Sequence, residues 1–338
     1  MKKIIIYNIN TSPGVRVIID NLLQNLRSYG FSVEESNNCD EPDAIYIPYA
    51  IKASYDCLKK KRLVLVNLMV DYLSYGCKNR AISLLKNGYL FSKELWIECA
   101  CFLLYRFKEK RVLKGFDSHM LVSYNDILRM KQLYENTKYY CVPNGCSIPS
   151  MLKDKTTSNS IRLGMLSMWT DGTLADVKWF IEGYLPKIKK IYPNLEVCIA
   201  GKCSNKHIEA YFRSADVKYY GWVDNLNDYF SNIDIYVATV PKGCGILNKV
   251  LDAFAHKTLC IGHNRSFSGF YGLQEGYIAC TSVDDYINAI QLYISDKYKV
   301  EKYINNAFSY IKRNNDWEHN YKNFINELIE DKKELLNG

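Results

Sequence analysis

The residues best suited to do chemistry lie in the stretch 237–262, which reads VATVPKGCGILNKVLDAFAHKTLCIG. A Pro/Gly-rich turn at 241–245 follows one short apolar strand, and a helix opening at about Ile246 leads to a second strand. This arrangement directs backbone N–H groups and the positive end of a helix at an anion. Lys249 adds a full positive charge, and Asp252 is placed one turn later to accept hydrogen bonds from ribose hydroxyls. The stretch indicates either a nucleotide diphosphate site or an ordinary βαβ crossover with a glycine turn.

Size and charge limit the elements that could position this stretch. The chain has 338 residues, which suits two domains of about 150 residues each. Residues 1–150 contain 21 Lys and Arg against 14 Asp and Glu, whereas residues 151–338 contain 23 against 22. The basic surplus in the first half predicts an anionic partner there, with a phospholipid surface or a lipid-linked phosphate ahead of nucleic acid. Nucleic acid ranks lower because the run Lys59-Lys60-Lys61-Arg62 is the one dense basic run and no nucleic-acid motif accompanies it.

The twelve cysteines are spread through apolar segments and predict reduced, mostly buried thiols in a cytosolic protein. The N-terminus MKKIIIYNIN has an apolar run of only a few residues and is expected to form a first strand, not a signal peptide. The sequence contains no run of 18 or more apolar residues, so no membrane span is expected. Cys99 and Cys101 lack partners at zinc spacing, so no metal site is expected.

Strands and helices alternate along both halves of the chain. The first half begins with a strand at 3–9, a turn at 10–14 and a helix at 15–28, and it has a further strand at 62–70. The polar, patternless stretch 149–160 is expected to be a linker. The alternation predicts an α/β protein with two doubly wound, Rossmann-like parallel sheets facing a central cleft. The expected units are a first domain at 1–148, the linker 149–160, a second domain at 161–315, and a C-terminal helix at 316–338 that packs back toward the first domain.

Two positions in the first half are expected to face the cleft. Arg16 lies at the start of its helix beside Gly14, where it serves either as a phosphate or acceptor ligand or as a solvated arginine. Asp71 follows the carboxyl end of a buried strand, where open α/β sheets bind ligands. It is a candidate for acceptor binding or catalysis, with capping of the next turn as the alternative.

Residues 79–113 combine aromatic and basic side chains in a helical pattern. Aromatic and basic residues together suit a helix at a membrane interface. The alternative, which we favour, is a half-buried helical hairpin with a solvated basic face.

Four segments resemble GT-B glycosyltransferases of family 4: PNGCS at 143–147, GKCSN at 201–205, GWVDNLNDYFSNIDIYVATV at 221–240 and GCGILNKVLDAFAHKTLCIG at 243–262. The last is closest to the branch whose usual pattern is G-x-G-I-x-N-K-V-L-E-A-M-A. The matches in the first half, Pro-Gly-Val-Arg at 13–16 and Asp71 with Ser74, are weaker.

The resemblance implies transfer of a sugar from a nucleotide diphosphate donor, with UDP expected first and GDP next, with retention at the anomeric carbon and without a metal or other cofactor. Basic side chains and backbone N–H groups would then stabilise the leaving diphosphate. The implied nucleotide-sugar site comprises Gly243, Cys244, Gly245, Ile246, Asn248, Lys249, Asp252, Lys202, Trp222 and Val223. The implied acceptor or phosphate side comprises Gly14, Arg16, Asp71 and Asn144, with Asp71 and Lys249 as catalytic candidates.

Two departures from the family pattern bear on the sugar contacts. Cys244 stands where family 4 has its first glutamate, and the usual Arg/Lys pair is missing from SMWTDGT at 167–173.

The function that the resemblance implies is a glycosyltransferase acting on a lipid-linked or glycan acceptor in bacterial surface polysaccharide synthesis. Such an enzyme would be cytoplasmic, with peripheral contact at an anionic inner membrane face. The alternatives are a nucleotide-sugar epimerase and a non-catalytic GT-B binding subunit.

Overall fold

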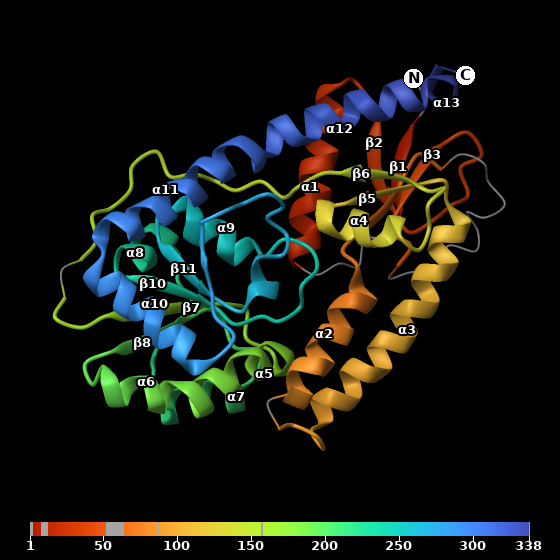
Figure 1. Cartoon of the computed structure of the whole chain (residues 1–338). Helices are drawn as coiled ribbons and strands as arrows, with labels where there is room; N and C mark the ends of the chain where they lie inside the picture. The colour runs from red at the N-terminus through yellow and green to blue at the C-terminus, as the bar shows by residue number, and fades with distance from the viewer. Residues whose placement is uncertain (1–2, 8–12, 52–63, 87, 157, 338) are drawn as a thin grey trace.

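The computed structural model describes residues 3–7, 13–51, 64–86, 88–156 and 158–337, and it arranges them in two lobes (Figure 1). The basic run at 59–62 and the greater part of the expected turn at 10–14 lie outside these residues. The N-terminal lobe lies to the right in Figure 1 and the C-terminal lobe to the left, and each is built around parallel strands.

The N-terminal domain contains two three-stranded parallel sheets, in the orders β2-β1-β3 and β4-β5-β6. A parallel bridge from Tyr46 to Val64 joins the two sheets into one layer. Most of these strands are buried on both faces, which explains their continuous apolar sequences. Their bounds are β1 Ile4–Tyr7, β2 Val33–Ser36, β3 Ile45–Pro48, β4 Asn67–Val70, β5 Ser118–Leu121 and β6 Lys138–Cys141.

Four helices flank this sheet layer: α1 (Pro13–Ser28), α2 (Leu73–Lys86), α3 (Lys93–Gly115) and α4 (Tyr124–Lys131). The helical pattern expected at 79–113 forms the antiparallel hairpin of α2 and α3, as favoured from sequence. Gly88, with φ 84°, lies in the connection between them. The buried Glu109 of α3 accepts a hydrogen bond from the Ser74 backbone N–H at 2.8 Å, so it satisfies a free amide in the first turn of α2.

The C-terminal domain has one six-stranded parallel sheet in the order β12-β11-β10-β7-β8-β9. The order reverses direction between β7 and β10, and ligands of open α/β sheets bind at such a switch point. The strands are β7 Arg162–Leu166, β8 Glu196–Ala200, β9 Lys218–Gly221, β10 Ile235–Ala238, β11 Leu259–Gly262 and β12 Ile278–Ala279. The helical segments are α5 Asp171–Trp179, the π-helical turn Phe180–Tyr184, α6 Leu185–Ile191, α7 Lys206–Ser214, α8 Leu226–Ser231, α9 Asn248–Ala255, the short 3₁₀ turn Asn264–Phe267, α10 Val283–Ser295 and α11 Lys297–Asn314.

The last long helix, α12 (Trp317–Asp331), returns from the C-terminal lobe to the N-terminal one along the top of Figure 1. Tyr321 is fully buried there, and its hydroxyl donates to the Ile18 carbonyl of α1 at 2.7 Å. Phe324 and Leu328 of α12 belong to the same apolar core as the first sheet. A short helix, α13 (Lys333–Asn337), follows. The N-terminal domain is thus completed by residues from the far end of the chain.

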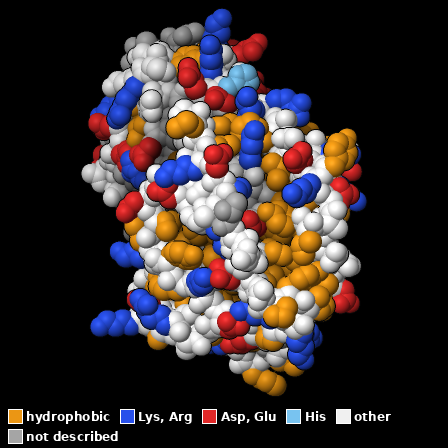
Figure 2. All heavy atoms as spheres, turned by 90° about the vertical axis from the view of Figure 1, so that its left-hand side faces the viewer, with side chains coloured by type: hydrophobic (Ala, Val, Ile, Leu, Met, Phe, Trp, Pro, Cys, Tyr) orange, Lys and Arg blue, Asp and Glu red, His pale blue; other side chains and the backbone are white. Residues whose placement is uncertain are grey.

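The face of the molecule on the left in Figure 1 belongs to the C-terminal lobe. Figure 2 shows acidic and basic side chains spread over this face, with hydrophobic side chains gathered right of centre. Among the described helices, none is both long enough and apolar enough to cross a bilayer.

Candidate active site

A cavity of about 590 Å³ lies where strands β7, β8, β9 and β10 end, at the rim that faces the N-terminal domain. Gly14, at the start of α1, contributes the N-terminal side of the wall. The other lining residues are Leu166, Ser167, Met168, Gly201, Trp222, Val223, Asp224, Leu226, Ile246, Leu247, Asn248 and Lys249. The volume is typical of small-molecule sites, and the carboxyl ends of parallel strands are where such sites form.

Lys249 is the basic side chain among the described residues that line this cavity. It lies in the first turn of α9, and its ammonium donates to Ser167 Oγ at 3.0 Å. No described carboxylate forms an ion pair with it. Burial lowers the pKa of Lys249 to about 8, with Asp176 opposing the decrease. A half-buried ammonium with a neutral partner at a helix N-terminus is suited to bind an anion.

Glycine permits the close backbone approach that shapes the cavity wall. Gly201 has φ 118°, and a Cβ there would lie 1.7 Å from the Ser167 carbonyl oxygen. Only a residue without a side chain fits this position. Ser167 is thereby held within reach of Lys249.

The turn at 241–245 packs against the N-terminal domain as well as against Arg265 and Gly269 of its own lobe. Asn79 donates to the Lys242 carbonyl at 2.9 Å, and Arg129 donates to the Gly243 carbonyl at 3.0 Å. The Gly245 backbone N–H donates to the Asp126 carboxylate at 2.8 Å. Cys244 is buried in an apolar cluster with Met69 and Leu121 of the N-terminal domain.

These contacts correct one expectation from the sequence. The turn was expected to offer free amides to a diphosphate, but the Gly245 amide is already bonded to Asp126. Gly243, Cys244 and Gly245 do not line the cavity, whereas Ile246, Asn248 and Lys249 do. Within this stretch, the start of α9 and not the turn therefore faces the cavity.

Asp71 lies at the domain interface beside this turn. Its carboxylate forms an ion pair with Lys242 at 2.8 Å. Its Oδ1 atom lies 2.1 Å from where a Cβ on Gly245 would be, so the two domains touch here without room for a side chain. Val70, just before Asp71, has φ 65°, a conformation that is strained for a β-branched residue.

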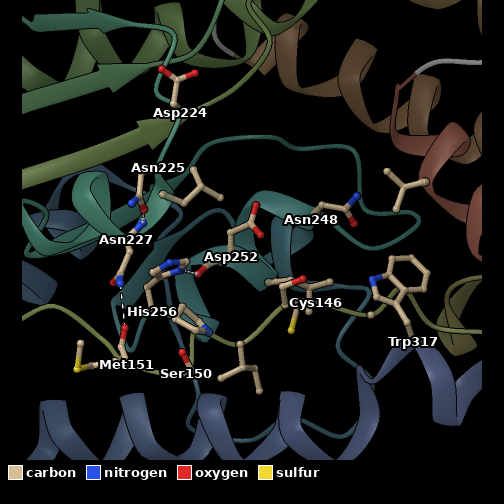
Figure 3. A pocket seen from close by; sticks show the side chains of 17 residues that line it. Cys146, Ser150, Met151, Asp224, Asn225, Asn227, Asn248, Asp252, His256 and Trp317 are labelled. Atoms are coloured by element: carbon tan, nitrogen blue, oxygen red, sulfur yellow. Dashed lines mark hydrogen bonds between the residues drawn. The ribbon is translucent and has the colours of Figure 1, made fainter.

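A second cavity of about 690 Å³ adjoins the first and shares Asp224, Leu226 and Asn248 with it. Figure 3 shows Asp252 and Asn248 reaching into it from α9, with His256 beside Asp252 and Trp317 on the opposite side. Burial raises the pKa of Asp252 to about 6. Its carboxylate accepts no hydrogen bond from the rest of the described chain, so it is free to accept one from a hydroxyl.

The remaining predicted residues fall into two groups. Trp222 and Val223 line the first cavity, and Trp222 is 65% exposed. Asn144 is buried and donates to Asn248 Oδ1 at 2.8 Å, which ties the end of the first domain to α9.

Arg16 and Lys202 are not brought to the cavities. The Arg16 guanidinium is bound by Glu35 and Asp20. It is therefore engaged as a structural ion pair and not directed at a ligand. Lys202 is exposed, and its backbone carbonyl accepts from the Trp169 N–H at 2.9 Å.

Sequence reasoning missed Asp126 and Ser167 as parts of this region. Asp126 is fully buried and also receives the Tyr72 amide at 3.3 Å. Asp126 lies in the first turn of α4, which follows β5, so it stands near the carboxyl end of a parallel strand. Ser167 follows β7 in the same way. Among the described residues, no group of three His, Cys, Asp or Glu side chains is arranged to hold a metal ion.

Comparisons with known proteins agree with this geometry. Residues 162–296 match the family model described as glycosyl transferases group 1. A search of curated proteins by sequence finds no match. Among solved structures, the chain is similar to sucrose-phosphate synthase from Thermosynechococcus elongatus, with a TM-score of 0.66 and 13% identity over 98% of this chain and 99% of that one.

Two further solved structures have the same fold. HepE from Anabaena, in complex with UDP and glucose, has a TM-score of 0.57 and 12% identity over 97% of this chain and 99% of that one. TarM has a TM-score of 0.60 and 11% identity. The match covers 91% of this chain but only 57% of the TarM chain. At such identities the similarity shows the fold alone.

The two facing Rossmann-like domains have the GT-B fold, and with the family match they define the chain as a glycosyltransferase by class. The matched model, glycosyl transferases group 1, covers β7 through α10, which form most of the C-terminal domain.

Proposed function

We propose that this protein transfers a sugar from a nucleotide diphosphate donor to an acceptor glycan or lipid-linked acceptor, with retention at the anomeric carbon. The observation that carries the proposal is Lys249, a half-buried lysine at the start of α9 whose ammonium has the neutral Ser167 hydroxyl as its protein partner. A diphosphate in the first cavity would supply the missing negative charge.

The roles of the residues follow from their places around the two joined cavities. Lys249 and the N-terminus of α9 stabilise the negative charge that develops on the leaving diphosphate, without a metal. Asp252 accepts hydrogen bonds from the ribose hydroxyls. Trp222 and Val223 bound the apolar end of the first cavity, where the nucleobase lies.

We propose UDP as the nucleotide, with GDP as the second choice. HepE, whose fold this chain shares, binds UDP and glucose in its crystal structure. The acceptor enters from the N-terminal domain, at the Asp71 side of the interface. We place the reaction in bacterial surface polysaccharide synthesis, at the cytoplasmic face of the membrane.

The test is a donor panel with the full chain. UDP- and GDP-linked sugars are each incubated with the protein, and release of free nucleotide is measured with and without oligosaccharide and lipid-linked acceptors. We expect one donor to be consumed, slowly without acceptor and faster with it. The rate with Lys249→Met should fall by about 100-fold, because a charge that stabilises the leaving group is lost. Consumption of no donor, or an unchanged rate in Lys249→Met, would contradict the proposal.

A non-catalytic GT-B subunit is a second candidate, favoured by Cys244. Its thiol is buried where family 4 enzymes have a glutamate, so the side chain at position 244 supplies no carboxylate. Such a subunit would bind UDP with the same dependence on Lys249 and consume no UDP-sugar. The donor panel together with UDP binding separates the two.

A further inference from the structure

Helix α3 has large apolar side chains on the side that faces solvent. The exposed fractions are 67% for Trp96, 68% for Leu103 and 67% for Phe107, and Phe91 in the preceding turn is 92% exposed. We call this surface the outer face of α3; it also includes Leu90, Ile97 and Leu104. An apolar surface of this extent is unusual on a soluble monomer and marks an interaction site.

The outer face is not needed for folding of the hairpin. The inner side of α3 supplies Leu95, Val112 and Leu113, which are buried in the protein core. Figure 1 shows α3 at the right-hand edge, with α2 between it and α5 of the C-terminal lobe. A helix that is apolar on both sides is expected to be covered on both sides, and among the described residues nothing covers the outer face.

The charges around the outer face identify its partner. Lys110 and Lys114 are exposed at the C-terminal end of α3, and Lys93 is exposed at its start. The three acidic residues of the helix are turned inward or half-buried: Glu109 is bonded to Ser74, Glu98 forms an ion pair with Arg80, and Glu94 is half-buried. The outer face thus presents apolar side chains bordered by cations.

A second copy of the chain fits this surface less well. In an antiparallel pair of α3 helices, Lys110 and Lys114 of one copy would lie against Trp96 and Ile97 of the other. In a parallel pair, the cations would face each other. Neither arrangement offers an acidic partner to the lysines, whereas anionic headgroups match all of them.

We propose that the outer face of α3 docks on an anionic phospholipid surface. Trp96, Leu103 and Phe107 enter the boundary between headgroups and acyl chains, and Lys110 and Lys114 bind the phosphates above it. The inference deepens the proposed function by naming how the enzyme reaches a membrane-borne acceptor, and it rests on that function only for the acceptor's location.

Vesicle flotation tests the proposal without any donor or acceptor. The full chain is mixed with vesicles of equal parts phosphatidylcholine and phosphatidylglycerol, or of phosphatidylcholine alone. We expect flotation with the anionic vesicles, weakened by salt. The triple variant Trp96→Ser/Leu103→Ser/Phe107→Ser should float at least about tenfold less, because three apolar side chains no longer enter the bilayer.

A matched control changes three exposed apolar residues of the C-terminal lobe, Ile191, Ile294 and Tyr298, to serine. This control should float like the wild type, and all three proteins should bind UDP equally. Failure of the wild type to float, or undiminished flotation of the α3 variant, would overturn the proposal. The proposal would also be overturned if the wild type bound no vesicles and light scattering showed that it forms a dimer which the α3 variant does not form. If the wild type floats but transfers no sugar, that result counts against the proposed function alone.

Discussion

At the scale of single residues, we expect Lys249 to lower the stability of the ligand-free protein and to favour binding of an anion. Burial lowers its pKa to about 8, below the ordinary value of 10.5. The charged form therefore destabilises the ligand-free protein fully below pH 8, and this cost disappears as the pH rises toward 10.5. We predict that Lys249→Met raises the free energy of unfolding by about 1 to 2 kcal/mol at pH 7.

Urea unfolding at several pH values measures this effect. The gain from Lys249→Met should shrink between pH 8 and 10.5, the interval set by the two pKa values. The exposed Lys187 on α6 is the matched control, and Lys187→Met should change stability little at any pH. A loss of stability in Lys249→Met at pH 7 would contradict this prediction, because it would show that contacts within the protein outweigh the cost of burying the ammonium.

Asp252 gives a prediction about the ribose. Its half-buried carboxylate has no hydrogen-bond donor among the described residues and reaches into the second cavity (Figure 3). Asp252→Ala should weaken UDP binding by about tenfold, because hydrogen bonds to a charged group are lost. The same substitution should hardly affect binding of a dideoxyribose analogue of UDP. Equal losses for the two ligands, measured by calorimetry, would remove Asp252 from the ribose site.

The sequence was sufficient to point to these residues individually. Lys249 and Asp252 are recognisable because their spacing on one helix follows a glycine turn, which is a local pattern. Asp126 could not be assigned to Gly245, because the two are separated by 119 positions and meet only when the domains pack. Which amides are free depends on that long-range contact, and so the role expected for the 243–245 turn needed the structure.

At the scale of elements, the turn before α9 is fixed by its glycines. Gly245 has φ 63°, and a Cβ there would lie 2.1 Å from Asp71 Oδ1. Gly245→Ala should therefore destabilise the protein by about 2 to 4 kcal/mol, from backbone strain and from the clash across the interface. Thermal unfolding with and without UDP measures the loss.

Gly272 provides the control for this prediction. It has a similar φ of 77°, but nothing lies within 4 Å of a Cβ placed there. Gly272→Ala should lose only about 1 kcal/mol, the cost of the backbone conformation. If the free energy of unfolding falls equally in both variants, the close contact of Gly245 with Asp71 does not contribute to stability.

Most elements were predictable because their patterns are local. Helix α1 and the apolar strands follow directly from the spacing of their apolar residues. The strand expected at 62–70 is regular only at Asn67–Val70, and Val64 makes an isolated bridge to Tyr46. The sequence does not show where pairing is interrupted, since that depends on the neighbouring strand.

At the scale of the whole molecule, α12 links the end of the chain to the first domain. Phe324 is buried and packs edge-to-face on Tyr140 of β6, with ring centroids 5.4 Å apart. Phe324→Ala should cost about 3 to 5 kcal/mol, because it leaves a cavity in the N-terminal core. The exposed neighbour Lys322 is the control, and Lys322→Ala should be nearly neutral. A small loss in Phe324→Ala by urea unfolding would show that α12 is only loosely attached.

The two-domain plan follows from the alternation of strands and helices in each half. The way the domains meet does not, because the contacts of Asp71, Asn79 and Asp126 with the 241–245 turn join distant segments. These contacts leave the start of α9 as the wall of an open cavity, and the functional proposal depends on that geometry.

Calorimetric titration of UDP into the full chain is the most direct test of this account. We expect saturable binding that Lys249→Met weakens by about 10- to 100-fold, since a charged contact to the diphosphate is lost. Lys187→Met should bind as the wild type does. If UDP and GDP both fail to bind, or if Lys249→Met binds them undiminished, the cavity at the start of α9 is not a diphosphate site.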